Sequence, residues 1–494
     1  MTNFDTPWYE LAETLSGKEL EKLVKSDNFV SCASVDEIAN VTIECKIPMV
    51  KMIYQITDRE KNVVKEGEYA FNKDGVNKFV IKDVVDLEEL KAYETDTYDY
   101  FLQTSVVLVS GVEVGGYFTL QCTLRNGSST TKIPSTDLKD KLANIPIAKP
   151  GMTEDELRKI CLEYMRLQLG FTFKFEKDFN YTVVSQKRPR RLIGGKVYAG
   201  IPYITRGAGN LYRIASIYDP KTGALDPESD IFDDIRYFGN ACSGSASMSW
   251  ARVVTSAYLG YTMFMTEANG FLPVGSYLYP EKNITRMLPK KLDSNGVNGK
   301  SICRFNGEQT MFESYALMKP ADGVGCCGHV RMNSAIPTVI RNDDGSIDGD
   351  KSFTLMCEQV CYTSNRNCVR IAQDGTHYHT QGFIDIKYSF RDLYEAGYFP
   401  FTFNEFINPN CVQPARIRLS VEPTLGERVL TSNYAISDVF AELDGKRYAF
   451  HNMEFFRKEV KMSDIFPEEI LSDKTKVSVQ LYNGELIFVD QNRF

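Results

Sequence analysis

The chain has 494 residues, and its 57 basic and 65 acidic side chains give a formal net charge of −8. An acidic chain without a long basic run is a poor candidate for nucleic-acid binding, because that affinity comes from neutralising phosphates. The composition is 43% hydrophobic and 25% charged, and no apolar stretch approaches the ~18 residues of a membrane-spanning helix. We therefore expect a globular protein of about three domains, with no transmembrane segment and no nucleic-acid partner.

Residues 1–149 are predicted to form a β-rich N-terminal module behind a short leading helix at 8–24. The first residues lack a basic region followed by an apolar core, so no signal peptide is expected and the compartment stays open. Between residues 29 and 145, short β-rich runs alternate with turn-formers such as Asp74-Gly75 and Asn126-Gly127. This spacing predicts a β-sandwich-like module with a supporting or binding role.

A second domain is predicted over residues 150–410, and it begins with a helix. Thr153 precedes Glu156 by three residues, which is the spacing of a capping box. The residues that follow, 154–169, carry one apolar stripe at helical spacing. After this helix the sequence becomes mixed, and the segment 387–400 has a helical, aromatic pattern that we expect to close the core of the domain.

A small C-terminal β domain is predicted over residues 411–494. Short apolar runs recur there, and the turn-forming pairs Asp444-Gly445 and Asn483-Gly484 separate them. The expected fold class is therefore α+β, with a mixed central domain flanked by two β-sandwich-like domains.

The run from Gly239 to Val253 predicts a loop that places Cys242 at the start of a helix. Aligned peptide dipoles put about half a positive charge at a helix N-terminus. Such a site can lower a thiol pKa from about 8.5 into the range of about 3.5 to 7.5. Cys242 is therefore a candidate nucleophile, and a buried structural cysteine is the alternative.

His329 follows Gly328 at the head of a predicted strand, on the face opposite Val330. A second apolar strand ends in Glu358 and Gln359, and a hairpin would lay it beside the histidine strand. Either side chain would then orient the imidazole. A thiolate, a base and an orienting group are the parts that covalent acyl transfer requires.

In this order, these segments resemble the NlpC/P60 and CHAP-type cysteine peptidases of the papain-like superfamily. The run Gly195 to Tyr203 is similar to the Gly-x-Pro-Tyr segment that precedes the cysteine in those enzymes. The sequence departs from the pattern of those enzymes in three places, all of which concern substrate specificity. Asn240-Ala-Cys242 replaces their Asp-Cys pair, and the interval from Cys242 to His329 is long, at 87 positions. Residues 273–300 resemble an insertion.

The resemblance implies a papain-like central domain that cuts amide bonds in peptidoglycan peptides without a cofactor. Cys242 would be the nucleophile, His329 its base and Glu358 the orienting group, with Gln359 as the alternative third residue. Tyr203 would line the site and help the backbone N–H of Cys242 to stabilise the oxyanion. A wall hydrolase of this kind would act outside the cell or in its wall.

Two other interpretations of these residues remain possible from the sequence. Cys326, Cys327, His329, Cys357 and Cys361 contain the ligand types that zinc prefers, although adjacent cysteines fit one tetrahedral ion poorly. The non-enzymatic alternative is a surface or wall-binding protein with a degenerate peptidase domain. The histidine pair in 376–379 and the basic run 187–191 are read as surface segments, and the acidic loop 342–350 as a solvated hairpin.

Overall fold

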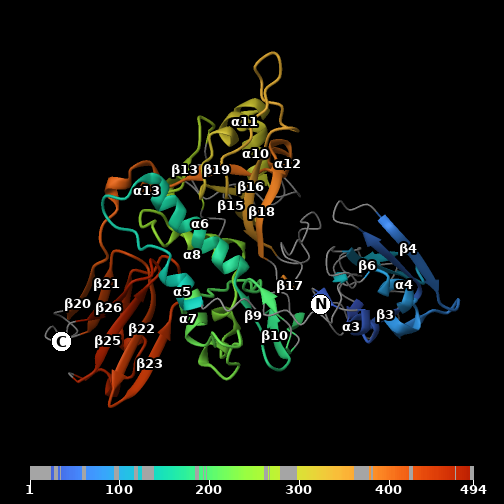
Figure 1. The fold of residues 1–494 in the computed structure, drawn as a ribbon, viewed down its shortest axis with the longest axis horizontal. Helices are drawn as coiled ribbons and strands as arrows, with labels where there is room; N and C mark the ends of the chain where they lie inside the picture. Colours follow the sequence, from blue (N-terminus) through green and yellow to red (C-terminus); the bar gives the residue numbers. More distant parts are fainter. Residues whose placement is uncertain are drawn as a thin grey trace.

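The computed structural model describes residues 24–26, 32–33, 35–57, 63–93, 100–115, 121–124, 138–183, 188–192, 194–195, 197–260, 265, 267–278, 297–326, 328–360, 378–379, 382–421, 427–472 and 474–489. Within these ranges helices combine with mostly antiparallel sheets, which confirms the α+β class. Three main hydrophobic cores lie in succession along the chain. Figure 1 shows the N-terminal strands in blue and the C-terminal strands in red on opposite sides of the central part.

The N-terminal strands form one eight-stranded sheet rather than the two sheets of the predicted sandwich, as far as the described residues show. The strands are β1 (Val24–Ser26), β2 (Cys32–Ala33), β3 (Thr42–Thr57), β4 (Val63–Ala70), β5 (Val76–Val80), β6 (Tyr100–Leu108), β7 (Glu113–Gly115) and β8 (Gln121–Leu124). The long strand β3 pairs with β1, β4, β5 and β6, so all of these strands belong to one sheet. Helices α3 (Val35–Ala39) and α4 (Leu87–Lys91) pack on the same core. The predicted leading helix lies outside the described residues.

The central core begins earlier than residue 150. Leu138 and Leu142 of α5 (Leu138–Ala143) belong to this core, as do Ile145 and Ala148 of the predicted linker. The segment 138–149 therefore packs with the second domain and not with the N-terminal sheet.

The helix predicted at 154–169 is confirmed as α6 (Glu154–Gly170). The Thr153 side chain accepts from the Glu156 backbone N–H, and the Glu156 carboxylate accepts from Thr153 N–H at 2.8 Å. This reciprocal capping fixes where α6 begins. Its buried face then packs against α8 (Cys242–Trp250) and the neighbouring strands β16 and β18.

A six-stranded sheet forms the other wall of the central part, in the order β13-β19-β14-β15-β16-β18. Its strands are β13 (Leu272–Pro273), β14 (Gly323–Cys326), β15 (His329–Asn333), β16 (Phe353–Gln359), β18 (Gly382–Ser389) and β19 (Phe399–Thr402). The predicted pairing of the His329 strand with the Glu358 strand is confirmed, with Met332 opposite Cys357. Helix α8 contacts both strands, which brings its N-terminal end to this sheet.

The central part also contains shorter strands and helices. They are β9 (Thr172–Phe173), β10 (Phe179–Val183), β11 (Arg188–Leu192), β12 (Tyr198–Ala199), β17 (Tyr378–His379), α7 (Leu211–Ser216), α10 (Val297–Asn306), α11 (Glu308–Ala316), α12 (Phe390–Ala396) and α13 (Asn404–Ile407). The helix expected within 387–400 is α12, whereas the residues just before it extend β18.

Two antiparallel sheets form the C-terminal domain, as predicted, and share one core. Their strands are β20 (Ile417–Val421), β21 (Arg428–Ser432), β22 (Ile436–Leu443), β23 (Lys446–His451), β24 (Glu459–Lys461), β25 (Lys476–Leu481) and β26 (Leu486–Val489). Asp444 and Gly445 both have positive φ in the predicted turn between β22 and β23. Ala435, Phe455 and Tyr482 pack into the central core, so the two domains are joined closely.

Within the part of the chain that the structure describes, none of the helices is both long enough and apolar enough to span a membrane.

Candidate active site

Cys242 is the first residue of α8, as the sequence predicts, and the helix is buried along its whole length. The helix ends at Trp250. Its first main-chain bond runs from Ser245 N–H to Ala241 C=O, so the preceding N–H groups have no acceptor within the helix. Cys242 therefore lies where the helix dipole favours negative charge.

Small side chains allow α8 to pass through the middle of the protein. A Cβ atom at Gly244 would lie 3.0 Å from Gly207 O and 3.1 Å from Asn240 Oδ1. The buried Ser249 hydroxyl donates to Ser245 O at 2.8 Å, and Gln168 Nε2 donates to the same carbonyl at 2.7 Å. The helix is thus held rigidly, which fixes the position of the sulfur.

Asn240 shapes the loop that leads to Cys242. Its side-chain oxygen accepts from Gly209 N–H at 2.9 Å, and its Nδ2 donates to Gly209 O at 2.9 Å and to Gln168 Oε1 at 3.2 Å. The amide both donates and accepts here, which an aspartate could not do. Asn240 therefore has a structural function in this loop.

A tight hairpin between β14 and β15 brings His329 to the sulfur. Cys326 pairs with His329 across the hairpin, and Gly328 in the turn has a φ of +89°, a conformation that favours glycine. The Cys242 Sγ lies 3.8 Å from Gly328 O. The turn thus fixes both the carbonyl beside the sulfur and the start of the histidine strand.

His329 lies between Cys242 and Glu358. Its Nε2 is 2.6 Å from Glu358 Oε2, and its ring is also within hydrogen-bonding reach of the Cys242 thiol. Because Glu358 occupies Nε2, the nitrogen that remains for the thiol is Nδ1. The structure therefore brings the three predicted residues together in the order thiol, imidazole, carboxylate.

The Glu358 carboxylate is fully buried and has two further partners. Arg331 Nε donates to its Oε2 at 2.8 Å, and the Tyr388 hydroxyl donates to its Oε1. Burial favours the neutral acid, but the Arg331 charge and the bonds from His329 and Tyr388 outweigh it and hold the pKa of Glu358 far below its usual range. The carboxylate therefore stays charged and supports a positive imidazole.

Arg331 lies between two aromatic rings. Its guanidinium carbon is 3.9 Å from the ring centre of Tyr388 and 4.1 Å from that of Tyr398. Flat cation–π contacts on both faces hold the fork toward Glu358. The positions of Glu358 and His329 thus depend on three residues for which the sequence predicted no role.

The pKa values of the thiol and the imidazole move in opposite directions. Burial would raise the pKa of the Cys242 thiol, yet the charge and hydrogen bond of His329 and the N–H groups of Val330 and Ser243 lower it. Burial would likewise lower the pKa of His329, but the Cys242 thiolate and Glu358 raise it to about 9. Both shifts favour a thiolate–imidazolium pair over a neutral thiol and a neutral imidazole.

Cys242 differs in this respect from the other described cysteines. Burial raises the thiol pKa to about 11 at Cys45, Cys326 and Cys357 and to about 12 at Cys303, and the direction is the same at Cys161 and Cys411. Among these seven free thiols, only Cys242 has a lowered pKa.

Gln359, the alternative third residue, has other partners. Its Nε2 donates to Ile201 O at 2.8 Å, and its Oε1 accepts from Ser245 Oγ at 3.4 Å. The Gln359 amide therefore links β16 to α8 and to the loop that contains Ile201. Glu358, and not Gln359, is the residue that contacts His329. The Tyr203 backbone pairs with Asn240, two residues before Cys242, which places it beside the cysteine loop.

The zinc alternative gains no support from the described residues, where no group of three His, Cys, Asp or Glu side chains has metal-binding geometry. Cys327 and Cys361 lie outside the described residues. His379 belongs to β17, which pairs with Ala199 of β12, and His377 is again outside the described part.

Comparison with known proteins does not assign this chain to a family. No protein-family model matches the chain, and no curated protein is detectably similar to it. The chemistry of the site therefore has to be argued from its geometry.

Proposed function

We propose that this protein is a cysteine peptidase or amidase in which Cys242, His329 and Glu358 form the catalytic triad. The observation that carries the proposal is the imidazole held between a buried carboxylate and a thiol whose pKa is lowered. Perturbed pKa values of this kind concentrate at catalytic sites. The resemblance of the three motifs to NlpC/P60 and CHAP-type enzymes points to the same chemistry.

In the first half of the reaction the Cys242 thiolate attacks the amide carbonyl carbon, and the carbonyl π electrons move to oxygen. Backbone N–H groups at the start of α8 are placed to stabilise this oxyanion, and we assign Tyr203 an auxiliary role. The tetrahedral intermediate then collapses, the C–N bond breaks, and the His329 imidazolium gives its proton to the departing amine. The product is a thioester on Cys242.

In the second half, neutral His329 takes a proton from water while the water oxygen attacks the thioester carbonyl. Collapse of this intermediate releases a carboxylic acid and restores the thiolate and the imidazolium. Glu358 remains ionised throughout and orients the ring, as the acidic member of a triad does. Every step uses groups of the chain and water, with no cofactor.

We propose peptides of bacterial peptidoglycan as the substrate class, on the strength of the motif resemblance. Access to the sulfur is narrow, since Cys242 is 5% exposed and the His329 side chain 19%. A slender, extended peptide that enters from the imidazole side suits this opening better than a folded protein segment.

The non-catalytic alternative, a binding protein with a degenerate peptidase domain, is less favoured by the same cluster. A buried ion network contributes little to stability that apolar side chains of similar volume would not supply. The buried contacts from Arg331 through Glu358 to His329 lead to a thiol whose pKa is lowered. Catalysis is the simplest explanation of this arrangement.

The test is hydrolysis of purified peptidoglycan and of synthetic stem peptides, followed by mass spectrometry of the products. Cys242→Ala should abolish turnover while circular dichroism stays unchanged. Cys326→Ala is the matched control, because this neighbouring thiol has a raised pKa and should be dispensable. Turnover by Cys242→Ala equal to that of the parent protein would refute the proposal.

A further inference from the structure

A second site lies away from the triad, in a cavity of about 1050 Å³ where the central part meets the C-terminal sheet. Its walls come from α5 and the chain after it, from α7, and from strands β22, β23, β25 and β26. None of the residues of the proposed triad lines this cavity. A role for it is therefore separate from the attack of Cys242.

One wall is apolar. Leu142 of α5 faces the cavity, as do Ile145, Pro146, Ile147 and Met152 from the segment after α5 and Phe440 from β22. Pockets that hold small molecules combine such a wall with a few placed polar groups. The volume suits a ligand of drug-like size.

The charged side chains of the lining are mainly basic. Four are cationic (Lys139, Lys149, Arg213, Arg447) and two are acidic (Asp230, Asp438), which leaves an excess of two formal positive charges among these six. Arg213 and Asp438 neutralise each other, because Arg213 Nε donates to Asp438 Oδ1 at 2.6 Å. The surplus therefore rests with the two lysines and Arg447.

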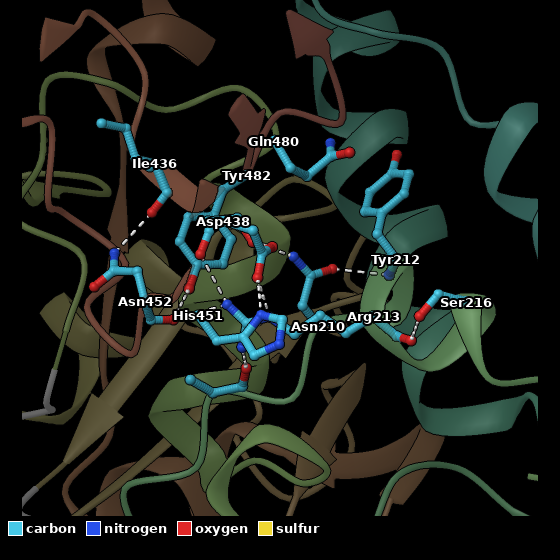
Figure 2. A network of polar contacts seen from close by, with 12 residues as sticks. Asn210, Tyr212, Arg213, Ser216, Ile436, Asp438, His451, Asn452, Gln480 and Tyr482 are labelled. Carbon is cyan, nitrogen blue, oxygen red and sulfur yellow. Dashed lines mark hydrogen bonds and ion pairs between the residues drawn. The ribbon is translucent and has the colours of Figure 1, made fainter. Parts of the chain in front are cut away.

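His451 places an unused nitrogen at the wall. Its Nδ1 is 2.6 Å from Asp438 Oδ1, so Nδ1 carries the proton that faces this carboxylate. Figure 2 shows the two side chains turned toward each other. The other nitrogen, Nε2, is buried without a hydrogen-bond partner and lies 3.9 Å from Asp230 Oδ2. A buried polar atom without a partner is uncommon. Because Nδ1 already holds the proton, Nε2 is open to a hydrogen-bond donor on the body of a ligand and not to its anionic group.

A further positive charge lies directly behind this wall. Arg252 is fully buried, and its Nε and Nη2 have no hydrogen-bond partner. Its Nη1 donates to the hydroxyl of Tyr212 at 2.7 Å and lies 2.0 Å from where a Cβ of Gly484 would be, and both of those residues line the cavity. In the low dielectric of the interior, this charge adds to the positive potential of the site.

We propose that this cavity binds a small organic anion with an apolar body, such as an aryl or alkyl sulfonate or carboxylate. The apolar body packs on the wall after α5, and the anionic group lies toward Lys149 and Arg447. The inference does not depend on the peptidase proposal, and it is tested by binding rather than by turnover.

The experiment uses the full chain and two fluorescent probes, 1-anilinonaphthalene-8-sulfonate and N-phenyl-1-naphthylamine, which differ by the sulfonate. The sulfonate probe should bind saturably at one site per chain, and more tightly than the neutral probe. Arg447→Gln and Lys149→Gln should each weaken sulfonate binding about threefold to tenfold, while binding of the neutral probe stays unchanged.

Lys446→Gln is the matched control, because it removes the same charge from the neighbouring residue of β23, whose side chain points to the other face of the sheet. It should leave both affinities unaltered. The proposal is overturned if Lys446→Gln and Arg447→Gln have equal effects, if the neutral probe binds as tightly as the sulfonate, or if binding does not saturate.

Discussion

Glu358 connects the buried charges of the site. Its carboxylate contacts the guanidinium of Arg331, the imidazole of His329 and the hydroxyl of Tyr388, and it has no exposed surface. Breaking a buried ion pair leaves an uncompensated charge. The resulting loss of folding free energy is several times larger than the loss from breaking an exposed ion pair. At the scale of residues, the reactivity of Cys242 is therefore set by groups up to two contacts away from the sulfur.

The pH dependence of hydrolysis should report this arrangement. The imidazolium is present below the His329 pKa of about 9 and is lost above it, so activity should fall on the alkaline side near this pH. The same raised pKa means that the ion pair stabilises the fold most fully below the ordinary histidine pKa, and that this contribution is lost as the pH passes about 9.

Glu358→Gln should move the alkaline limb to lower pH, because one of the two charges that raise the His329 pKa, beside that of the Cys242 thiolate, is gone. It should also reduce kcat/KM about 10²-fold or more. Tyr388→Phe serves as the comparison, since it removes one hydrogen bond and keeps the carboxylate. It should move the limb less. An alkaline limb at the same pH in Glu358→Gln and in the parent protein would separate Glu358 from His329.

At the scale of elements, the hairpin β14–β15 decides where His329 lies. Gly328 has a φ of +89°, and a Cβ there would meet no atom within 4 Å. Gly345, in the turn between β15 and β16, has a φ of +84° and is equally open. The two glycines thus differ in their distance from the sulfur but not in the strain that a side chain would cause.

Gly328→Ala and Gly345→Ala should each lower the free energy of unfolding by about 1 to 2 kcal/mol, the cost of an alanine in this conformation. Only Gly328→Ala should also reduce hydrolysis, because only that turn borders Cys242. Urea unfolding and initial rates on the same preparations give both quantities. Equal activity in the two variants would show that the hairpin does not position the histidine.

The elements with local signals were predictable from sequence. The capping box at Thr153 and Glu156 located α6, and the turn-forming pairs located the C-terminal hairpins. Strand β3 was not predictable, because Pro48 divided its pattern into two runs, whereas the structure continues the strand through it. The end of α8 was not predictable, because the run from Gly239 to Val253 continues past Trp250, where the helix ends, into a buried turn.

The same distinction applies to the site. Cys242, His329 and Glu358 stood in recognisable local motifs. Arg331 had a visible signal, since it lies two residues after His329 and so on the same face of the strand. Tyr388 of β18 and Tyr398, just before β19, had none. Only the assembly of the sheet, in which β18 pairs with β16 and β19 with β14, brings them to Arg331.

At the scale of the whole molecule, the central and C-terminal parts share buried contacts, whereas the N-terminal sheet has its own core. The guanidinium of Arg213 donates to Asp438, to the Ser437 and Asn452 carbonyls, and to Ala208 O. Figure 2 shows Arg213 and Asp438 meeting across this junction. Ala208 lies in the segment that Asn240 holds, so the C-terminal sheet supports the cysteine loop from behind.

Calorimetry should therefore resolve two unfolding transitions, one for the N-terminal sheet and one for the central and C-terminal parts together. Asp438→Ala should destabilise only the second, by about 3 to 5 kcal/mol, because it leaves Arg213 buried without its carboxylate. Glu68→Ala, which removes an exposed partner of Lys51 in the N-terminal sheet, should change either transition by about 1 kcal/mol or less. Separate melting of the central and C-terminal parts would contradict this view.

The most direct test of the central claim is the pH dependence of alkylation of Cys242 by iodoacetamide, followed residue by residue with mass spectrometry. A thiolate paired with His329 should already react at a pH below the ordinary thiol pKa, before the other cysteines do, and His329→Ala should shift this profile to higher pH. A Cys242 profile that rises only near the ordinary thiol pKa of about 8.5, and that His329→Ala leaves unchanged, would contradict the account.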